Sequence, residues 1–250
     1  MKTVARLRRW LLAGLLVASL AANALLAHWL LDVFKTLQFV RVFPLGYSMR
    51  ESLGESVAPR PSIAFWGDSR AAAWAESDAM RARSALNFAH GGQTSSQLVL
   101  QLRTTPARHT DFAVVQIGIN DLHPLGALPA QREEILARLR ENIAAICELL
   151  RERSDTVVFT TIVPPGPTPL MRRVLWDPET ARYVREVNAL IRRSADARRV
   201  VVLDAAALLG EEDGHLPVRF TDPDFFLHFN STAYALLDDR LQQLLALPDK

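Results

Sequence analysis

The stretch FAVVQIGIND, residues 112–121, begins as a nearly continuous apolar run and then changes to glycine, asparagine and aspartate. A short apolar run that ends at a glycine is typical of a strand whose two faces are both buried. The same pattern occurs in residues 63–69, IAFWGDS, where the apolar run ends at Gly67. Both stretches therefore predict buried strands whose carboxyl ends carry polar residues.

Apolar runs and helical patterns alternate through the rest of the chain. The predicted strands are 63–66, 85–89, 112–117, 156–163 and 200–203, and the predicted helices are 71–80, 95–103, 131–152, 179–193 and 231–247. This alternation predicts an α/β protein with three α/β/α layers, namely a flavodoxin-like five-stranded parallel sheet covered by helices. For the strand order 2-1-3-4-5, a ligand is expected beyond the carboxyl ends of strands one and three.

The N-terminal region predicts one transmembrane helix. Residues 10–31 contain no charged residue, and a helix of that length, roughly 33 Å, is enough to cross a bilayer core of about 30 Å. Basic residues precede this run, so the positive-inside rule predicts a cytoplasmic tail, 1–9, and a transmembrane signal anchor, 10–31. The domain would then lie on the periplasmic side of the cell inner membrane. A cleaved signal peptide, with a small-x-small site at residues 22–24, is the alternative.

Two regions follow the predicted anchor. Residues 32–61 are expected to form a juxtamembrane connector, with helical spacing in its first part and a linker rich in Pro, Gly and Ser from residue 44 onward. Residues 62–250 are expected to form a single domain. Four of the 29 basic residues and none of the 27 acidic ones precede residue 32, so this domain has a slight acidic excess. That balance argues against a nucleic-acid partner.

The strand ends carry the candidate site. The predicted topology places Ser69 and Asn120 at neighbouring strand ends, while Gly92 follows the second strand and His228 precedes the last helix. Acyl transfer needs a nucleophile, a base and hydrogen-bond donors for the developing oxyanion. A hydroxyl, an imidazole, a backbone N–H and a side-chain amide supply these groups. The single cysteine, Cys147, and the spacing of the histidines offer no metal-ligand pattern, so no metal or cofactor is expected.

These residues resemble, in order, the blocks of the SGNH (GDSL) hydrolase family, here in a membrane-anchored bacterial form. Gly67-Asp68-Ser69 matches the first block, residues 87–94 resemble the second, Gly118-Ile119-Asn120-Asp121 is an intact G-x-N-D block, and His228 precedes the terminal helix. The resemblance implies the SGNH fold, Ser69 as nucleophile and His228 as base. It also implies an oxyanion hole made of the N–H groups of Ser69 and Gly92 and the amide of Asn120.

The sequence departs from the family pattern at two positions. The family's carboxylate lies three residues before the histidine, where this chain has Phe225. We expect Asp224 to orient His228, with Asp222, a backbone carbonyl or a Ser-His dyad as alternatives. Arg70 replaces the leucine of the first block, and its guanidinium is expected either to meet an anionic or sugar substrate or to face solvent.

The sequence thus predicts a membrane-tethered serine esterase that forms an acyl-enzyme on Ser69 and acts on a small-molecule, glycan or lipid ester. An O-acyltransferase for a cell-envelope glycan would use the same residues, and a catalytically impaired binding module is the non-enzymatic alternative. A nucleotide binder ranks last because no glycine-rich phosphate loop is present. The Pro-rich segment 164–178 follows strand four on the side of the site, so it either shapes the substrate pocket or is a surface connection.

Overall fold

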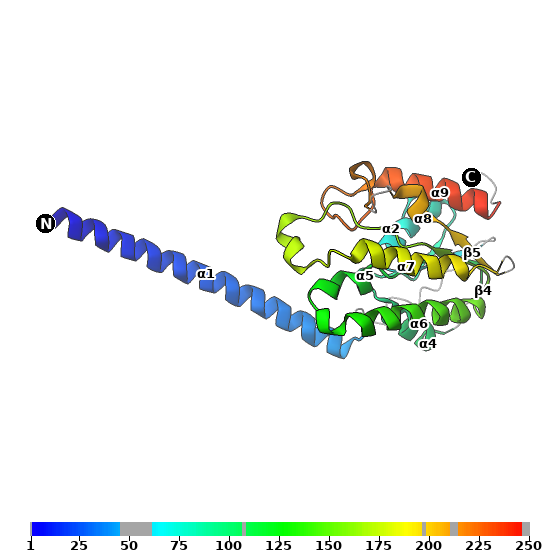
Figure 1. Ribbon diagram of the computed structural model, residues 1–250, viewed down its shortest axis with the longest axis horizontal. Coiled ribbons are helices and arrows are strands. Elements are labelled where there is room, and N and C mark those ends of the chain that lie inside the picture. The colour runs from blue at the N-terminus through cyan, green and yellow to red at the C-terminus, as the bar shows by residue number, and fades with distance from the viewer. Residues whose placement is uncertain (1, 46–61, 107–108, 197–198, 211–214, 247–250) are drawn as a thin grey trace. The chain divides into compact units, whose positions relative to one another are not determined.

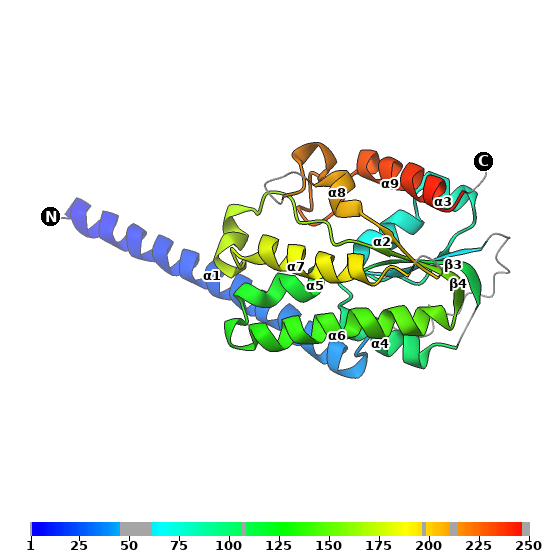
Figure 2. The ribbon, with the colours of Figure 1, turned by 45° about the vertical axis from the view of Figure 1, so that its right-hand side comes forward.

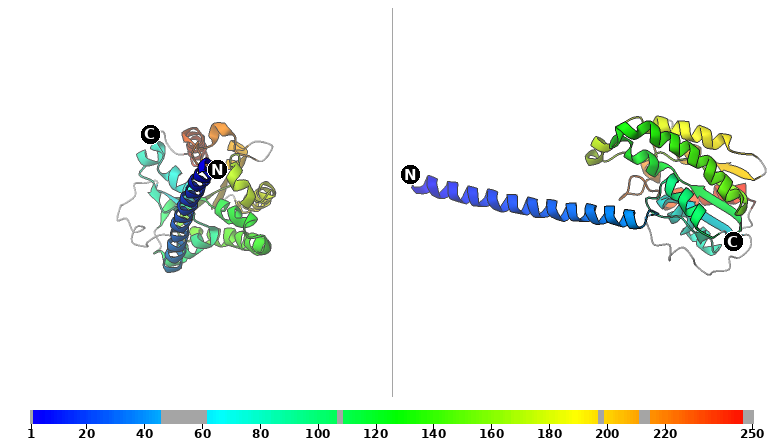
Figure 3. Two further views of the ribbon diagram at one scale, coloured as in Figure 1. Left: turned by 90° about the vertical axis from the view of Figure 1, so that its left-hand side faces the viewer. Right: turned by 90° about the horizontal axis from the view of Figure 1, so that it is seen from below.

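The computed structural model describes residues 2–45, 62–106, 109–196, 199–210 and 215–246. The chain divides into two compact units, Met1–Gly46 and Tyr47–Lys250. The first unit contains one unbroken helix, α1 (Lys2–Val42), which is drawn in blue in Figure 3. Its segment 6–42 is long and apolar enough to cross a membrane, and an 18-residue stretch within it has a mean hydropathy of 2.0. The predicted connector is thus helical as far as Val42, and its linker from 46 to 61 lies outside the described residues.

The second unit is built on a five-stranded sheet. The strands are β1 (Ile63–Gly67), β2 (Leu86–Asn87), β3 (Thr110–Gln116), β4 (Ser154–Thr160) and β5 (Val200–Leu203). All paired strands are parallel, and their order is β2-β1-β3-β4-β5. This order confirms the predicted topology. It places the carboxyl end of β1 between those of β2 and β3, and the switch point of such a sheet lies between β1 and β3.

Helices cover both faces of the sheet, as Figures 1 and 2 show. The α-helices of this unit are α2 (Ser69–Ala75), α3 (Asp78–Ala82), α4 (Ser95–Thr104), α5 (Ile119–Leu122), α6 (Arg132–Arg151), α7 (Thr180–Arg193), α8 (Ala205–Leu209) and α9 (Ser231–Leu244). Short 3-10 helices are η2 (His123–Gly126), η3 (Pro129–Gln131), η4 (Leu170–Leu175) and η5 (Val218–Phe220). This arrangement confirms the three-layer α/β/α prediction.

The two cores arise from the alternation of side chains along each strand. In β1, Trp66 packs with α4, α6 and α7 on one face of the sheet. Its neighbour Phe65 packs with α2, α3, α8 and α9 on the other face. Because both faces are covered, the strands are apolar at nearly every position, which explains why their runs could be recognised in the sequence. Cys147 is buried in α6, and burial raises the pKa of its thiol to about 11.

Some predicted boundaries are wrong. The helix predicted at 71–80 is two helices, because the side chain of Ser77 accepts a hydrogen bond from the N–H of Met80 and starts α3. The strand predicted at 85–89 is reduced to Leu86–Asn87 at the sheet edge. The short helices α5 and α8 were not predicted, since segments of four or five residues have too little periodicity to be recognised.

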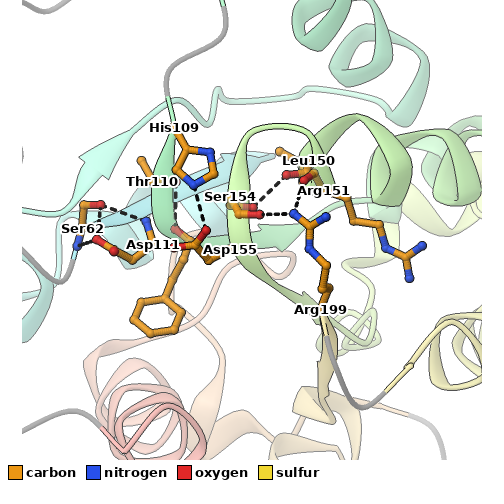
Figure 4. Close-up of polar contacts among 10 residues, drawn as sticks. Ser62, His109, Thr110, Asp111, Leu150, Arg151, Ser154, Asp155 and Arg199 are labelled. Atoms are coloured by element: carbon orange, nitrogen blue, oxygen red, sulfur yellow. Dashed lines mark hydrogen bonds and ion pairs between the residues drawn. The ribbon is translucent and has the colours of Figure 1, made fainter.

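Polar contacts join the amino ends of neighbouring strands (Figure 4). The N–H and the hydroxyl of Ser62 both donate to Oδ2 of Asp111, each at 2.7 Å, which links the start of β1 to β3. His109 Nε2 lies 2.9 Å from Oδ1 of Asp155, which links β3 to β4. Arg199 donates to the carbonyl of Ser154 at 2.8 Å, before β5 begins. The candidate site lies at the carboxyl ends of the strands, on the opposite side of the sheet.

Candidate active site

Ser69 lies at the turn that joins β1 to α2. Gly67 has a φ of +128°, and a Cβ there would lie 1.9 Å from the carbonyl oxygen of Gln116, so only glycine fits. The next residue, Asp68, caps α2, because its Oδ1 accepts the N–H of Arg70 at 2.9 Å. Ser69 is then the first residue of the helix and is half-buried, and its N–H has no partner within the helix.

His228 meets Ser69 from a distant part of the chain. Its Nε2 lies 3.0 Å from the hydroxyl oxygen of Ser69, although 159 residues separate them in sequence. The backbone N–H of His228 donates to the carbonyl of Phe225 at 2.8 Å. This bond closes a tight turn before α9, and the imidazole projects from that turn. The 3.0 Å distance between Nε2 of His228 and the hydroxyl oxygen of Ser69 is the hydrogen-bond length expected between a nucleophile and its general base.

The imidazole of His228 is held in its neutral form near neutral pH. Partial burial lowers its pKa below the ordinary value of 6.5, and the positive charge of Arg70 lowers it further. The negative charge of Asp222 acts in the opposite direction and raises this pKa. A neutral imidazole can accept a proton, so the electrostatics suit a base.

Asp222 is placed better than Asp224 to support His228. The N–H of Asp222 donates to the carbonyl of His228 at 3.0 Å, and Oδ1 of Asp222 accepts the N–H groups of Asp224 and Phe225 at 2.8 and 3.1 Å. Within the part of the chain that the structure describes, neither carboxylate is hydrogen-bonded to the imidazole. The ring of Phe225, at the family's acid position, packs against the imidazole with centroids 5.2 Å apart. The Asp224 assignment stays a prediction, and the charge of Asp222 favours the alternative.

A pair of isosteric variants separates these two aspartates. Asp222→Asn is expected to lower kcat about tenfold, because it removes a negative charge that favours the imidazolium formed during catalysis. Its amide oxygen can still accept the N–H groups of the loop. Asp224→Asn is expected to change kcat by less than twofold. Steady-state hydrolysis of p-nitrophenyl acetate measures both, and a larger loss for Asp224→Asn would contradict this order.

Gly92 and Asn120 lie on the two sides of the Ser69 turn, because β1 is the strand between β2 and β3. Gly92 has a φ of +72°, which glycine adopts without strain, and no heavy atom lies within 4 Å of a Cβ built there. Nδ2 of Asn120 donates to the carbonyl of Gln93 at 3.0 Å, which ties the end of β3 to the Gly92 turn. The amide of Asn120 has a second N–H to offer to an oxyanion.

Loss of this amide has a defined expected cost. Asn120→Ala is expected to lower kcat by about 10²–10³-fold, the usual cost of losing one oxyanion donor. KM should change little, because such a donor bonds most strongly to the charge that develops in the transition state. The measurement is kcat and KM for p-nitrophenyl acetate, and a rise in KM alone would show that Asn120 binds substrate instead.

Asp121 was not predicted to have a role, and the structure shows one. It is buried, and its two oxygens accept the N–H and the hydroxyl of Ser95 at 2.9 and 2.6 Å. This pair joins the turn after β3 to the start of α4, immediately after the Gly92 turn. Burial raises the pKa of Asp121 to about 6, while its bonds to Ser95 lower it. The aspartate of the G-x-N-D block therefore links the turn that carries Asn120 to the helix that follows the Gly92 turn.

Arg70 fits neither of its two predicted roles, which were contact with an anionic or sugar substrate and exposure to solvent. Its side chain is only 1% exposed, so it does not face solvent. Burial lowers its pKa to about 10, and the charge of Asp68 raises it, so the guanidinium stays charged. In turn, burial raises the pKa of Asp68 to about 6, and Arg70 opposes that rise.

Arg70 holds the segment that carries His228. Its Nε donates to the carbonyl of Leu227 at 2.5 Å, and its guanidinium carbon lies 4.5 Å from the ring centre of Phe229. A second nitrogen donates to the carbonyl of Val163, after β4, at 2.5 Å. The residues on both sides of His228 are thus anchored to the sheet by one buried cation. The sequence signal for this role was the arginine that directly follows the GDS block.

A hollow of about 440 Å³ opens beside His228. Residues 221–228 form one wall, and Pro167, Pro169 and Arg172 form another. Segment 164–178 therefore contributes to a hollow next to the candidate base.

A family model and several solved structures are similar to this chain. The family model of the GDSL-like lipase/acylhydrolase family matches residues 52–236. A GDSL-like lipase from Bacteroides thetaiotaomicron is 20% identical, with a TM-score of 0.59 over 78% of this chain and 93% of that chain. An acetylxylan esterase from Geobacillus stearothermophilus is 15% identical, with a TM-score of 0.50 over 77% and 97%. At these identities the likeness shows the fold. The curated proteins gave no match.

The family model covers well over half of the chain and includes Ser69, Asn120 and His228. The predicted blocks therefore lie within the region that the family model matches. The solved structures similar to this chain include a lipase and an esterase, and together with the family they support an ester-hydrolysing function. This chain belongs to the GDSL-like lipase/acylhydrolase family.

Proposed function

We propose that this protein is a serine esterase that acts through an acyl-enzyme on Ser69. The observation that carries the proposal is the 3.0 Å contact between the hydroxyl oxygen of Ser69 and Nε2 of a neutral His228. A hydroxyl is a weak nucleophile until a base takes its proton, and this contact supplies that base.

The reaction has two balanced halves. In the first, the oxygen of Ser69 attacks the ester carbonyl carbon while its proton passes to His228. The N–H groups of Ser69 and Gly92 and the amide of Asn120 donate to the oxyanion of the tetrahedral intermediate. When the intermediate collapses, the alcohol leaves with the proton of His228. In the second half, His228 takes a proton from water, the hydroxide attacks the acyl carbon, and the acid departs as the proton returns to Ser69.

We further propose that α1 anchors the enzyme in the cell inner membrane with its hydrolase unit in the periplasm. The helix is long and apolar enough to span a bilayer, and Arg6, Arg8 and Arg9 precede its uncharged run. The positive-inside rule then favours a cytoplasmic N-terminus. The membrane is thus the proposed partner of α1, and an ester is the proposed partner of the site.

Covalent labelling tests the enzymatic proposal directly. A fluorophosphonate probe is expected to label the full-length protein once, and peptide mass spectrometry should place the adduct on Ser69. A series of p-nitrophenyl esters from acetate to palmitate then gives the preferred acyl length. A folded protein that neither reacts with the probe nor hydrolyses any ester of the series would overturn the proposal.

A further inference from the structure

The second unit exposes its large apolar side chains unevenly. Four of those that the structure describes are strongly exposed, namely Leu170 at 76%, Val218 at 74%, and Leu175 and Phe225 at 60% each. The other exposed ones of this unit are at most 44% exposed. The strongly exposed side chains thus come from only two stretches, 170–175 and 218–225. Such clustering marks an interaction surface more often than chance exposure of single residues does.

The two loops that carry these stretches are joined by backbone hydrogen bonds. The N–H of Gly166 donates to the carbonyl of Phe226 at 2.7 Å, and the N–H of Leu216 donates to the carbonyl of Pro165 at 3.0 Å. The start of the first loop is therefore bonded to both ends of the second, and the loops lie side by side.

The strongly exposed side chains lie at the mouth of the hollow beside His228. Val218 and Phe225 line that hollow together with Arg172. Leu170 and Leu175 are the first and last residues of η4, the 3-10 helix that contains Arg172. We call these four side chains the apolar surface: Leu170, Leu175, Val218 and Phe225.

Arginines accompany most of the apolar surface. Arg172 and Arg173 lie between its two leucines in the sequence, and Arg219 follows Val218; all three are exposed. Within the part of the chain that the structure describes, neither Arg172 nor Arg173 forms an ion pair. The acidic residues are confined to the stretch that leads to His228, where Asp222 and Asp224 line the hollow near Phe225. Three of the four apolar side chains therefore have a cation within two residues.

Exposed aliphatic side chains beside arginines are typical of a surface that lies on a membrane. The apolar groups enter the boundary between headgroups and acyl chains, while the guanidinium groups stay among the lipid phosphates. The chain also joins this unit to α1, which is long and apolar enough to span a bilayer. A bilayer that holds α1 would be present at a high effective concentration, so weak contacts would be enough for docking.

We propose that the second unit docks on a bilayer of anionic lipid through the apolar surface, with Arg172, Arg173 and Arg219 against the lipid phosphates. Docking would place the mouth of the hollow beside His228 at the surface of the membrane. The inference concerns where this unit lies, and it holds whether or not Ser69 reacts with an ester.

The test uses full-length protein in vesicles made of equal parts of phosphatidylcholine and phosphatidylglycerol. Leu170→Cys carries an environment-sensitive fluorophore, and the buried Cys147 should take up little of it. Lipids with a spin label on the acyl chain are expected to quench this fluorophore about twofold or more, since the side chain enters the bilayer. Leu100→Cys, at an exposed leucine of α4 in neither loop, is the control and should be quenched far less.

The charge has its own test. Quenching at residue 170 should fall by about half or more in vesicles of phosphatidylcholine alone, and added salt should weaken it in the anionic vesicles. Arg173→Gln should also weaken it, whereas Arg185→Gln, at an exposed arginine of α7, should not. All variants should hydrolyse p-nitrophenyl acetate in detergent as the unaltered protein does.

Each other outcome would contradict part of the inference. Equal quenching at residues 170 and 100 would overturn docking, and equal quenching in neutral and anionic vesicles would overturn the role of charge. Energy transfer between copies labelled at residue 170, seen in place of quenching by lipid, would show that a second copy of the chain covers the surface. Hydrolysis of p-nitrophenyl acetate by the same preparations shows separately whether the proposed esterase function holds.

Discussion

Ser69→Ala is expected to lower kcat for p-nitrophenyl acetate by about 10⁴–10⁶-fold. The variant lacks the oxygen that His228 contacts at 3.0 Å, so no acyl-enzyme can form. What activity remains would come from the oxyanion donors acting on water. The measurement is steady-state hydrolysis, with residual rates compared with the buffer reaction.

The matched control is Ser231→Ala, because Ser231 is an exposed serine in the first turn of α9. It should keep kcat within twofold of the unaltered enzyme. Both variants should unfold at the same temperature as the unaltered protein, since Ser69 is half-buried and makes no helix-capping bond. More than a tenth of the normal kcat in Ser69→Ala would show that another group is the nucleophile.

Arg70→Met is expected to lower the free energy of unfolding by about 3–5 kcal/mol, the usual cost of breaking a buried charge arrangement. The variant keeps an unbranched apolar stem but leaves the carbonyls of Val163 and Leu227 without their donor, and Asp68 without its neighbouring cation. Denaturant unfolding of the full-length protein in detergent measures this loss. Arg185→Met, on the exposed side of α7, should change the stability by less than 0.5 kcal/mol.

The same variant has an expected pH signature. Burial and the charge of Arg70 hold the pKa of His228 below 6.5, so kcat/KM of the unaltered enzyme should rise with pH at a midpoint below that value. Without the charge, the pKa of His228 should rise and the midpoint should move to higher pH. A structural loss alone would lower the amplitude of the profile without moving its midpoint, and an unmoved midpoint would contradict this electrostatic role.

The sequence predicted the sheet well because its strands are covered on both faces. Residues 63–66 and 112–117 are apolar at nearly every position for that reason, and each run ends where a glycine is required. Shorter elements were harder to predict. The start of α3 after Ser77 depends on one capping hydrogen bond, and the two-residue β2 depends on its pairing with β1.

Part of the candidate site follows from the topology of the sheet. Ser69, Gly92 and Asn120 follow strands whose order the alternation predicts, so their neighbourhood is a consequence of topology. The carboxylate was harder, since the family position holds Phe225 and the choice between Asp222 and Asp224 depends on how one loop folds. The ring of Phe225 packs on the imidazole, and the charge of Asp222 acts on it.

The sequence by itself determined the parallel α/β sheet, the apolar N-terminal helix and the order of the family blocks, because these follow from side-chain patterns between close neighbours. Only the tertiary structure decided that Arg70 is buried and that His228 meets Ser69. The carbonyls that hold Arg70 belong to residues 93 and 157 positions away, and His228 lies 159 positions from Ser69. A buried charge finds its partners through the packing of distant segments, and local sequence carries no record of that packing.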